Sequence, residues 1–161
     1  MKLTKKIILN YLAEVKDPEI PVLSLIDLGV ITNIDISDND HVKVEMIPTF
    51  MGCPAIDYMK ADVIKALKEK GIENCEVNVT INKQWNSNLI TEKGRHAIKA
   101  FGLAPPQKHN MNVEVDIIEN VACPFCDSKS TELKNPFGPT LCRSMHYCND
   151  CKQMFEQFKP V

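Results

Sequence analysis

Apolar residues recur at helical spacing in three stretches of this chain and alternate with polar residues in three others. The first helical stripe is formed by Leu3, Ile7, Ile8, Leu12 and Val15. It predicts a helix over residues 3–15, because positions three and four apart share one helix face. The helix is expected to end before Asp17 and Pro18, since the residue preceding a proline is pushed out of the helical conformation.

The same spacing predicts two further helices. One begins shortly after Cys53, and its stripe is formed by Ile56, Met59, Val63, Ile64 and Leu67. Gly71 suits the end of this helix, because glycine readily adopts the left-handed conformation that closes a helix. The other is expected around residues 91–101 and ends at Gly102.

Alternating apolar and polar residues predict strands over residues 30–36, 42–46 and 75–82. A cluster of turn-forming residues, 37–40, joins the first two strands and predicts a β-hairpin with one buried face. The predicted order is therefore α-β-β-α-β-α, which we expect to form an α+β sandwich with the helices on one face of a small sheet. The single tryptophan, Trp85, is expected to cover the edge of this core.

The composition is that of a soluble globular protein, because 44% of the 161 residues are hydrophobic, 25% are charged and the net charge is -2. No block of lysine and arginine is present in the sequence, so neither nucleic acid nor an anionic membrane surface is expected as a partner. The apolar run near the start breaks at Asn10 without a small-residue cleavage site, and no apolar run approaches ~20 residues. We therefore expect a cytoplasmic protein with no membrane partner.

A short loop between the second strand and the second helix carries the first candidate for chemistry. Its residues, 48–54, read Pro-Thr-Phe-Met-Gly-Cys-Pro. Pro54 suits the first position of a helix, which makes Cys53 the expected N-cap, and Gly52 allows the backbone to turn just before it. The helix dipole favours negative charge at that position, so Cys53 is a candidate reactive or metal-binding sulfur. The alternative is a cysteine that packs as a small hydrophobe.

The distribution of the seven cysteines indicates a second site. Cys53 and Cys75 stand alone, whereas five cysteines crowd into the last quarter of the chain. An odd number in a chain without a secretion signal argues against a disulfide framework. Two Cys-x-x-Cys pairs, separated by residues 127–147, match the four-thiolate pattern of a zinc ribbon. A unit this small has too little core to fold alone, so we expect these four cysteines to hold a structural zinc. They are Cys123, Cys126, Cys148 and Cys151.

Two more potential ligands, Cys142 and His146, lie between the two pairs. Cys142 could replace one of the four cysteines, bind a cluster or simply pack. A four-cysteine iron–sulfur cluster is an alternative to zinc, because thiolates suit both metals. A closed shell of four thiolates leaves no open coordination position, so the metal is expected to be structural and not hydrolytic.

Two adjacent prolines mark a linker over residues 104–112, because they favour an extended spacer. We accordingly divide the chain into a domain of residues 1–107, a linker of residues 108–112 and a zinc-ribbon domain of residues 113–161. The ribbon domain opens with a strand-like run over residues 113–118.

Several short motifs follow one another along the chain. In the first domain they are Asp17-Pro18-Glu19-Ile20-Pro21, Ser24-Leu25-x-Asp27-Leu28-Gly29, Pro48-Thr49-x-x-Gly52-Cys53-Pro54, Trp85, Gly94-Arg95 and Ala104-Pro105-Pro106. In the tail they are Cys123-Pro124-x-Cys126-x-Ser128-x-x-Thr131-Glu132-Leu133, Phe137-Gly138-x-Thr140-x-Cys142-Arg143 and Tyr147-Cys148-x-x-Cys151. In this order the motifs of the first domain resemble the metal–sulfur cluster biosynthesis family. Together with the tail motifs they resemble the PaaD-like proteins, which are accessory proteins of bacterial phenylacetyl-CoA epoxidase systems, over nearly the whole chain.

The resemblance implies an iron–sulfur-assembly fold of the SufT type for the first domain and a cytoplasmic protein that acts on protein partners in phenylacetate degradation. Those partners would be oxygenase or reductase subunits of the epoxidase and iron–sulfur assembly proteins. The loop cysteine of the family falls on Cys53, which is the expected contact for a transient iron ion or iron–sulfur cluster. The residues expected to support it are Thr49, Gly52, Asp17 and Glu19.

Three functions are compared on this basis. In the first and favoured one, the protein is a non-catalytic maturation factor in which Cys53 holds iron or a cluster together with ligands from a second chain, for example in a homodimer. In the second, Cys53 is the nucleophile of an enzyme, which is disfavoured because no histidine stands at a motif spacing from it. In the third, the chain is a structural subunit of the oxygenase.

Overall fold

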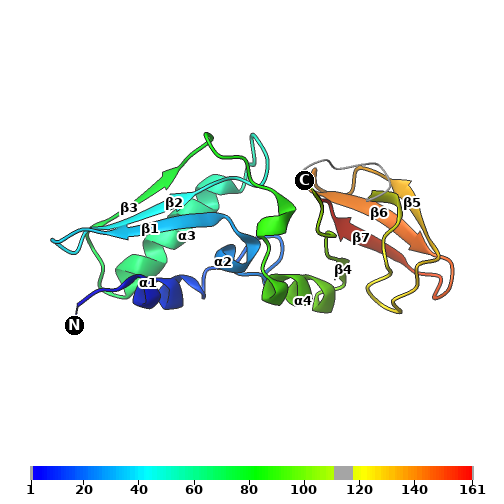
Figure 1. Cartoon of the computed structure of the whole chain (residues 1–161), viewed down its shortest axis with the longest axis horizontal. Coiled ribbons are helices and arrows are strands. Elements are labelled where there is room, and N and C mark those ends of the chain that lie inside the picture. The colour runs from blue at the N-terminus through cyan, green and yellow to red at the C-terminus, as the bar shows by residue number, and fades with distance from the viewer. Residues whose placement is uncertain (1, 111–117, 161) are drawn as a thin grey trace. The chain divides into compact units, whose positions relative to one another are not determined.

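The computed structural model describes residues 2–110 and 118–160. The chain divides into two compact units, residues 1–85 and residues 86–161. Figure 1 draws both units and labels their helices and strands. Each unit has its own sheet.

The sheet of the first unit has three strands in the order β1-β2-β3. The strands are β1 (Ile31–Ile36), β2 (Val42–Met46) and β3 (Cys75–Val79). β1 and β2 form the predicted antiparallel hairpin, and β3 lies parallel to β2. Val42, Val44 and Met46 are completely buried on one face of β2, as their alternation with Lys43 and Glu45 predicted.

Two amphipathic helices, α1 (Lys5–Leu12) and α3 (Ile56–Glu69), pack against this sheet and against each other. Their buried residues are Ile8 and Leu12 on α1 and Met59, Val63 and Leu67 on α3. The Oγ1 atom of Thr4 accepts a hydrogen bond from the Ile7 N–H and so caps α1. α3 ends just before Gly71, whose φ of 83° is the left-handed conformation expected there. Both helices confirm the predicted stripes.

A short helix, α2 (Leu25–Leu28), occupies a stretch for which no helix was predicted. The Ser24 Oγ accepts from the Asp27 N–H at 3.0 Å and donates to the Asp27 carboxylate at 2.7 Å. Gly29 ends the helix with a φ of 79°. A helix of four residues is too short to show a periodic apolar stripe, so only its two caps could have predicted it.

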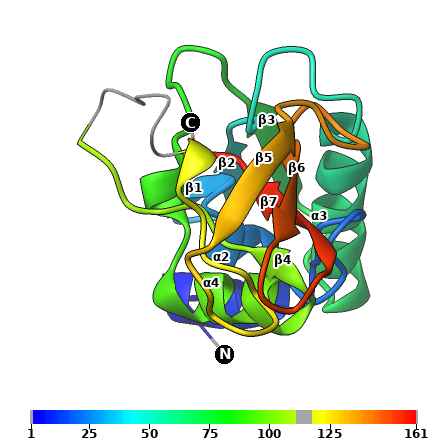
Figure 2. The ribbon, with the colours of Figure 1, turned by 90° about the vertical axis from the view of Figure 1, so that its right-hand side faces the viewer.

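The sheet of the second unit has four strands in the order β4-β7-β6-β5. The strands are β4 (Leu103–Ala104), β5 (Thr131–Asn135), β6 (Arg143–Cys148) and β7 (Met154–Phe158). β5, β6 and β7 run antiparallel to one another and lie side by side in Figure 2, whereas β4 pairs with β7 in parallel. The expected zinc-ribbon unit is therefore built on a sheet whose edge strand comes from far upstream in the chain.

A 3-10 turn, η1 (Ser87–Leu89), and the helix α4 (Glu92–Ala100) precede β4. The Thr91 Oγ1 caps α4 by accepting from the Gly94 N–H at 3.0 Å. The helix confirms the stretch predicted at residues 91–101, and Gly102 follows it with a φ of 97°.

The division between the units falls between Trp85 and Asn86, whereas the sequence pattern placed the domain boundary at residue 107. The reason is β4, which ties the preceding helix into the second sheet. A pairing between segments so distant in sequence leaves no local pattern. The strand-like run at residues 113–118 lies, except for Ile118, outside the described residues.

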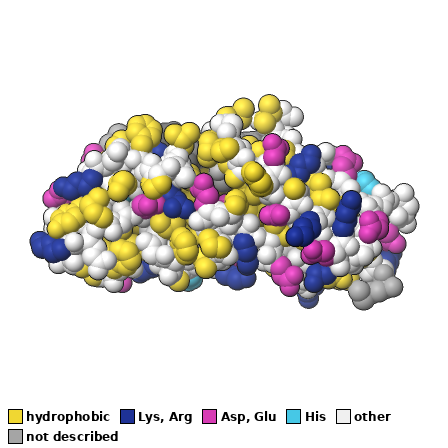
Figure 3. Space-filling model, turned by 180° about the vertical axis from the view of Figure 1, so that it is seen from behind, with side chains coloured by type: hydrophobic (Ala, Val, Ile, Leu, Met, Phe, Trp, Pro, Cys, Tyr) yellow, Lys and Arg dark blue, Asp and Glu magenta, His cyan; other side chains and the backbone are white. Residues whose placement is uncertain are grey.

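Within the described residues no helix combines the length and the apolarity needed to cross a membrane. On the face drawn in Figure 3, basic and acidic side chains are interspersed among apolar ones. That distribution agrees with the balanced charge of the sequence.

Candidate metal and thiol sites

The two Cys-x-x-Cys segments fold into turns of the same geometry. In the first, the Asp127 N–H donates to the Cys123 carbonyl, and the Cys123 N–H donates to the Ser128 carbonyl, both at 2.9 Å. In the second, Lys152 and Gln153 make the matching bonds with Cys148 at 3.0 and 2.9 Å. The residue after each second cysteine, Asp127 and Lys152, has a positive φ of 60° and 61°. Each segment thereby presents two thiols from one tight turn.

Together the two turns bring four sulfur atoms within 4.8 Å of one another, from Cys123, Cys126, Cys148 and Cys151. The Cys123 and Cys151 sulfurs are 3.6 Å apart, as are those of Cys126 and Cys148. A tetrahedral zinc with Zn–S bonds of about 2.3 Å requires sulfur–sulfur distances of about 3.8 Å. The four cysteines therefore fit one tetrahedral metal ion, and the second unit carries a metal-binding group.

The pKa values of these thiols also favour the binding of a cation. Burial raises the pKa of Cys151 to about 12. At Cys148 burial raises the pKa, but the N–H groups of Cys151 and Asp150 and the neighbouring thiols outweigh it and lower the pKa to about 7. One thiolate forms readily, and its charge opposes a second one at this spacing. A dication would balance the charges and allow all four to ionise.

Cys142 and His146 lie outside this group. Cys142 precedes β6 and Cys148 ends it, so about 20 Å of extended strand separates them. The Cys142 sulfur instead lies 3.0 Å from the Thr140 hydroxyl. His146 is completely buried, its Nε2 is 2.8 Å from the Ser144 hydroxyl, and its ring stacks on that of Phe155. Burial lowers the pKa of His146 and so keeps the imidazole neutral.

The loop that carries Cys53 lies at the end of the first sheet where β2 finishes. β2 and β3 are parallel, so their carboxyl ends meet at this end, where the Thr80 N–H donates to the Met46 carbonyl at 2.9 Å. Residues 47–55 follow β2 directly and join it to α3. Ligand sites of open sheets with parallel strands gather at the carboxyl ends of those strands. Cys53, which is half-buried, is therefore well placed for chemistry.

Cys53 is not the N-cap of α3, contrary to the sequence prediction. The helix begins at Ile56, its N-cap is Ala55, and that cap makes no side-chain hydrogen bond. Cys53 and Pro54 belong to the preceding turn, in which the Ile56 N–H donates to the Cys53 carbonyl at 3.3 Å. The bond spans three residues and not four, so the chain turns more tightly here than an α-helix does. Gly52 confirms the expected sharp turn with a φ of 79°.

The other motifs of the first unit support this end of the sheet. The chain enters β1 from α2, and the Ile47 N–H donates to the Val30 carbonyl at 2.9 Å, which joins the start of the Cys53 loop to the residue that precedes β1. The indole N–H of Trp85, buried to 2% exposure, donates to the Leu28 carbonyl at 2.9 Å and satisfies the end of α2. Trp85 thus does more than cover the core, because it fixes the end of the short helix by a specific bond.

The expected supporting residues take different places. One carboxylate oxygen of Asp17 accepts from the Glu19 and Ile20 N–H groups, both at 2.8 Å, and so closes the turn that contains Pro18. Glu19 is exposed, and Thr49 is half-buried in the Cys53 loop. Within the described part of the chain, no three His, Cys, Asp or Glu ligand atoms gather around Cys53. The structure does not bring Asp17 and Glu19 together with Cys53 into a metal site.

Exposed apolar side chains accompany the Cys53 loop. They belong to Met51 in the loop, Tyr58 in the first turn of α3 and Ile81 just after β3, and are exposed by 72%, 73% and 67%. On soluble proteins, exposed apolar side chains that form one contiguous patch mark places where another molecule docks. His41, the histidine of the first unit, precedes β2, so it lies at the opposite end of that strand from the Cys53 loop. The first unit therefore offers Cys53 no histidine as a general base.

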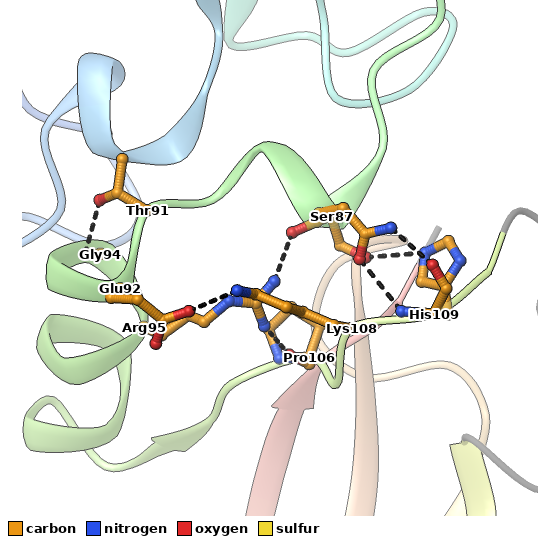
Figure 4. A network of polar contacts seen from close by, with 9 residues as sticks. Ser87, Thr91, Glu92, Gly94, Arg95, Pro106, Lys108 and His109 are labelled. Atoms are coloured by element: carbon orange, nitrogen blue, oxygen red, sulfur yellow. Dashed lines mark hydrogen bonds and ion pairs between the residues drawn. The ribbon is translucent and has the colours of Figure 1, made fainter.

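A polar network that the sequence did not predict holds residues 106–109 against α4 and η1, as Figure 4 shows. Arg95, only 9% exposed, donates to the carbonyls of Ser87, at 2.8 Å, and Pro106. The Ser87 hydroxyl lies 3.2 Å from the His109 Nε2. Lys108 pairs with Glu92 at 2.7 Å, and this bond lowers the pKa of Glu92. The Gly94-Arg95 motif was visible in the sequence, but its role as a clamp depends on backbone carbonyls, which sequence patterns do not specify.

Comparison with known proteins adds to this picture. Residues 107–159 match the model of the PaaD zinc beta ribbon domain, and residues 5–79 match the model of an iron–sulfur cluster assembly protein. A protein of Escherichia coli K12, named as one of the subunits of a "Putative 1,2-phenylacetyl-CoA epoxidase", is 30% identical over 150 residues. The match covers 93% of this chain and 89% of that protein.

A second relative, from Porphyromonas gingivalis W83, is named "Fe-S protein maturation auxiliary factor". It is 36% identical over 91 residues, which cover 56% of this chain and 86% of that protein. Among solved structures, a domain of unknown function (DUF59) from Bacillus anthracis is similar with a TM-score of 0.55 and 25% identity. The match covers 58% of this chain and 90% of that domain.

Proposed function

The chain belongs to the PaaD family, and on this premise we propose that it is a non-catalytic factor that helps to assemble or repair a metal centre in another protein. The names of its relatives support an auxiliary role in the maturation of iron–sulfur proteins. In this role Cys53 binds iron or an iron–sulfur cluster only while it is being transferred. Thiolates suit both cargoes.

One observation carries the proposal: Cys53 is half-buried in its loop, and in the described residues no group of three or more His, Cys, Asp or Glu ligand atoms includes its sulfur. A resident metal site needs three or four ligands from one protein, whereas a transfer site can share them with its partner. The exposed side chains of Met51, Tyr58 and Ile81 give such a partner an apolar surface to contact. A second copy of the chain could supply the additional thiolate in the same way.

The metal of the second unit has a different role in this proposal. Zinc bound by Cys123, Cys126, Cys148 and Cys151 has a complete shell of four thiolates, so no position is open for water or substrate. Such a zinc stabilises the fold and performs no hydrolysis. Elemental analysis of the purified protein distinguishes zinc from iron at this group.

The client that we propose is a phenylacetyl-CoA epoxidase, because the relative from Escherichia coli carries that name. The protein would act on oxygenase or reductase subunits whose iron centres must be loaded after synthesis. The name of that relative also calls it a subunit, so a structural component of the epoxidase complex is the second candidate. Copurification at fixed stoichiometry with active epoxidase would favour the second candidate, and its absence the first.

The test compares Cys53→Ser with Cys75→Ser, each produced with the epoxidase subunits in cells that lack the native factor. Cys75 begins β3, at the opposite end of that strand from the Cys53 loop, so it is a suitable control. We expect Cys53→Ser to lower the iron content and activity of the epoxidase to the level seen without the factor, and Cys75→Ser to leave both unchanged. Normal iron loading with Cys53→Ser would contradict the proposal.

A further inference from the structure

One buried cluster of the second unit is built largely from the cysteines of the metal-binding group, beside other buried apolar side chains such as Ile98 and Phe158. The cluster contains Ala104, Val121, Cys123, Cys148 and Phe155, with Cys151 packed against it. Three of these six residues are metal ligands, and only Phe155 is large. Apolar burial alone therefore stabilises this cluster weakly, and we expect the metal to hold its sulfur-bearing members in place.

Ala104 connects this cluster to a segment that precedes the first cysteine of the group. It is 1% exposed and belongs to β4, which pairs in parallel with β7 through Leu103 with Glu156 and Ala104 with Gln157. β7 in turn follows the second cysteine pair directly. A two-residue strand makes few hydrogen bonds, so its place depends on the core beneath it.

The first cysteine turn also contacts α4 and the residue after it. Lys99, in the last turn of α4, forms an ion pair with Asp127. Gly102 lies so close to Phe125 that a Cβ atom at this position would be 3.5 Å from the aromatic ring. Both partners belong to the turn that presents Cys123 and Cys126. Any rearrangement of that turn therefore acts on the end of α4.

Arg95 in α4 also holds the chain before and after this helix, because it donates hydrogen bonds to the carbonyls of Ser87 and Pro106, as Figure 4 shows. The Gln107 side chain donates to the Asn120 carbonyl at 2.8 Å, just before the first cysteine turn. Residues 92–107 thus contact the first cysteine turn at Lys99 and Gly102 and the residue Asn120 before it at Gln107.

We infer that metal binding by the four cysteines fixes α4 and β4 in place and that loss of the metal releases them. The segment acts as a latch that is closed only while the metal is bound. The inference concerns residues upstream of the zinc ribbon and goes beyond the proposed function, because it does not depend on what Cys53 carries.

The experiment is hydrogen–deuterium exchange of the full-length zinc-loaded protein before and after treatment with a strong chelator. We expect the amides of residues 92–104 to exchange roughly tenfold faster or more after metal removal, because the core beneath β4 is lost. The amides of α3 serve as the internal control and should keep their protection. Elemental analysis confirms the loss of zinc in the same sample.

Two outcomes would overturn the inference. If β5, β6 and β7 lose protection while α4 keeps it, the helix is ordered independently of the metal. If α3 and α4 lose protection together, the metal stabilises the whole chain and not a specific segment. Restored protection of residues 92–104 after zinc is added back supports the latch and excludes irreversible damage.

A pair of variants tests the contact without touching a cysteine. Lys99→Ala removes the ion pair with Asp127 and keeps a good helix former. We expect it to speed exchange at the end of α4 about two- to fivefold with zinc still bound, as loss of an exposed ion pair allows. His96→Ala, at an exposed position of the same helix, is the matched control and should not speed exchange, because alanine is the better helix former. Equal exchange in the two variants would remove Lys99 from the latch.

Discussion

The two units of this protein bury their interiors by different means. In the first unit, long aliphatic side chains such as Leu12, Val44 and Leu67 are completely buried between two helices and a sheet. In the second, one buried cluster is formed largely by three cysteines of the metal-binding group, beside apolar residues such as Ile98 and Phe158. The comparison indicates that the first unit is stabilised by apolar burial and the second by a metal ion.

The largest effect should come from removing a metal ligand. Cys148→Ser is expected to abolish zinc binding and unfold the second unit, since metal binding by such sites contributes on the order of 10 kcal/mol to folding. The first unit should stay folded. Elemental analysis measures the zinc, and hydrogen exchange of α3 and β6 shows which unit opens. Retained zinc in this variant would show that the four-sulfur assignment is wrong.

A substitution in the apolar core of the first unit should destabilise that unit alone. Leu67→Ala removes a completely buried side chain from α3 and should lower the free energy of unfolding of the first unit by about 2–5 kcal/mol. The zinc content should remain that of the wild type. Denaturant unfolding followed by Trp85 fluorescence reports on this unit, because the indole is buried there. A parallel loss of zinc would show that the units are not independent.

A smaller effect is expected at the end of α2. Trp85→Phe keeps an aromatic ring but removes the N–H that satisfies the Leu28 carbonyl, which should cost about 1–3 kcal/mol. Because the variant has no tryptophan, its unfolding is followed by circular dichroism. If the free energy of unfolding were unchanged, another donor or water would have to satisfy the carbonyl.

The smallest effect is expected at Cys142. Cys142→Ser should leave the zinc content unchanged, because this residue lies at the other end of β6 from Cys148. Serine can replace the thiol in its contact with the Thr140 hydroxyl. A variant that lost its zinc as Cys148→Ser does would place Cys142 among the ligands.

Much of the first unit could be predicted from the sequence because its signals are local. The stripes on α1 and α3 and the alternation in β2 each repeat over several residues, so short-range patterns identify them. The α2 helix was missed because four residues carry no period. The start of α3 was misplaced because Pro54 suits a helix start but also suits the tight turn that precedes Ile56.

In the second unit the spacing of the cysteine pairs indicated the metal-binding group, since each short turn presents two thiols and two such turns supply the four that a zinc ion needs. The role of β4 could not be predicted, because pairing between Ala104 and Gln157 depends on contacts far apart in sequence. Nor did any residue pattern show that the Arg95 guanidinium would bind two backbone carbonyls.

The parallel pairing of β4 with β7 also constrains how the protein is made. Residue 103 leaves the ribosome 53 positions before residue 156, its partner in the sheet. At about 5–20 residues per second, the short strand waits about 3–10 seconds for that partner to be synthesised. The strands of the first unit are complete by Val79, so we expect this unit to fold during translation while β4 still lacks its partner. Protease digestion of ribosome-stalled chains ending near residue 130 tests this order, and protection of α4 in them would contradict it.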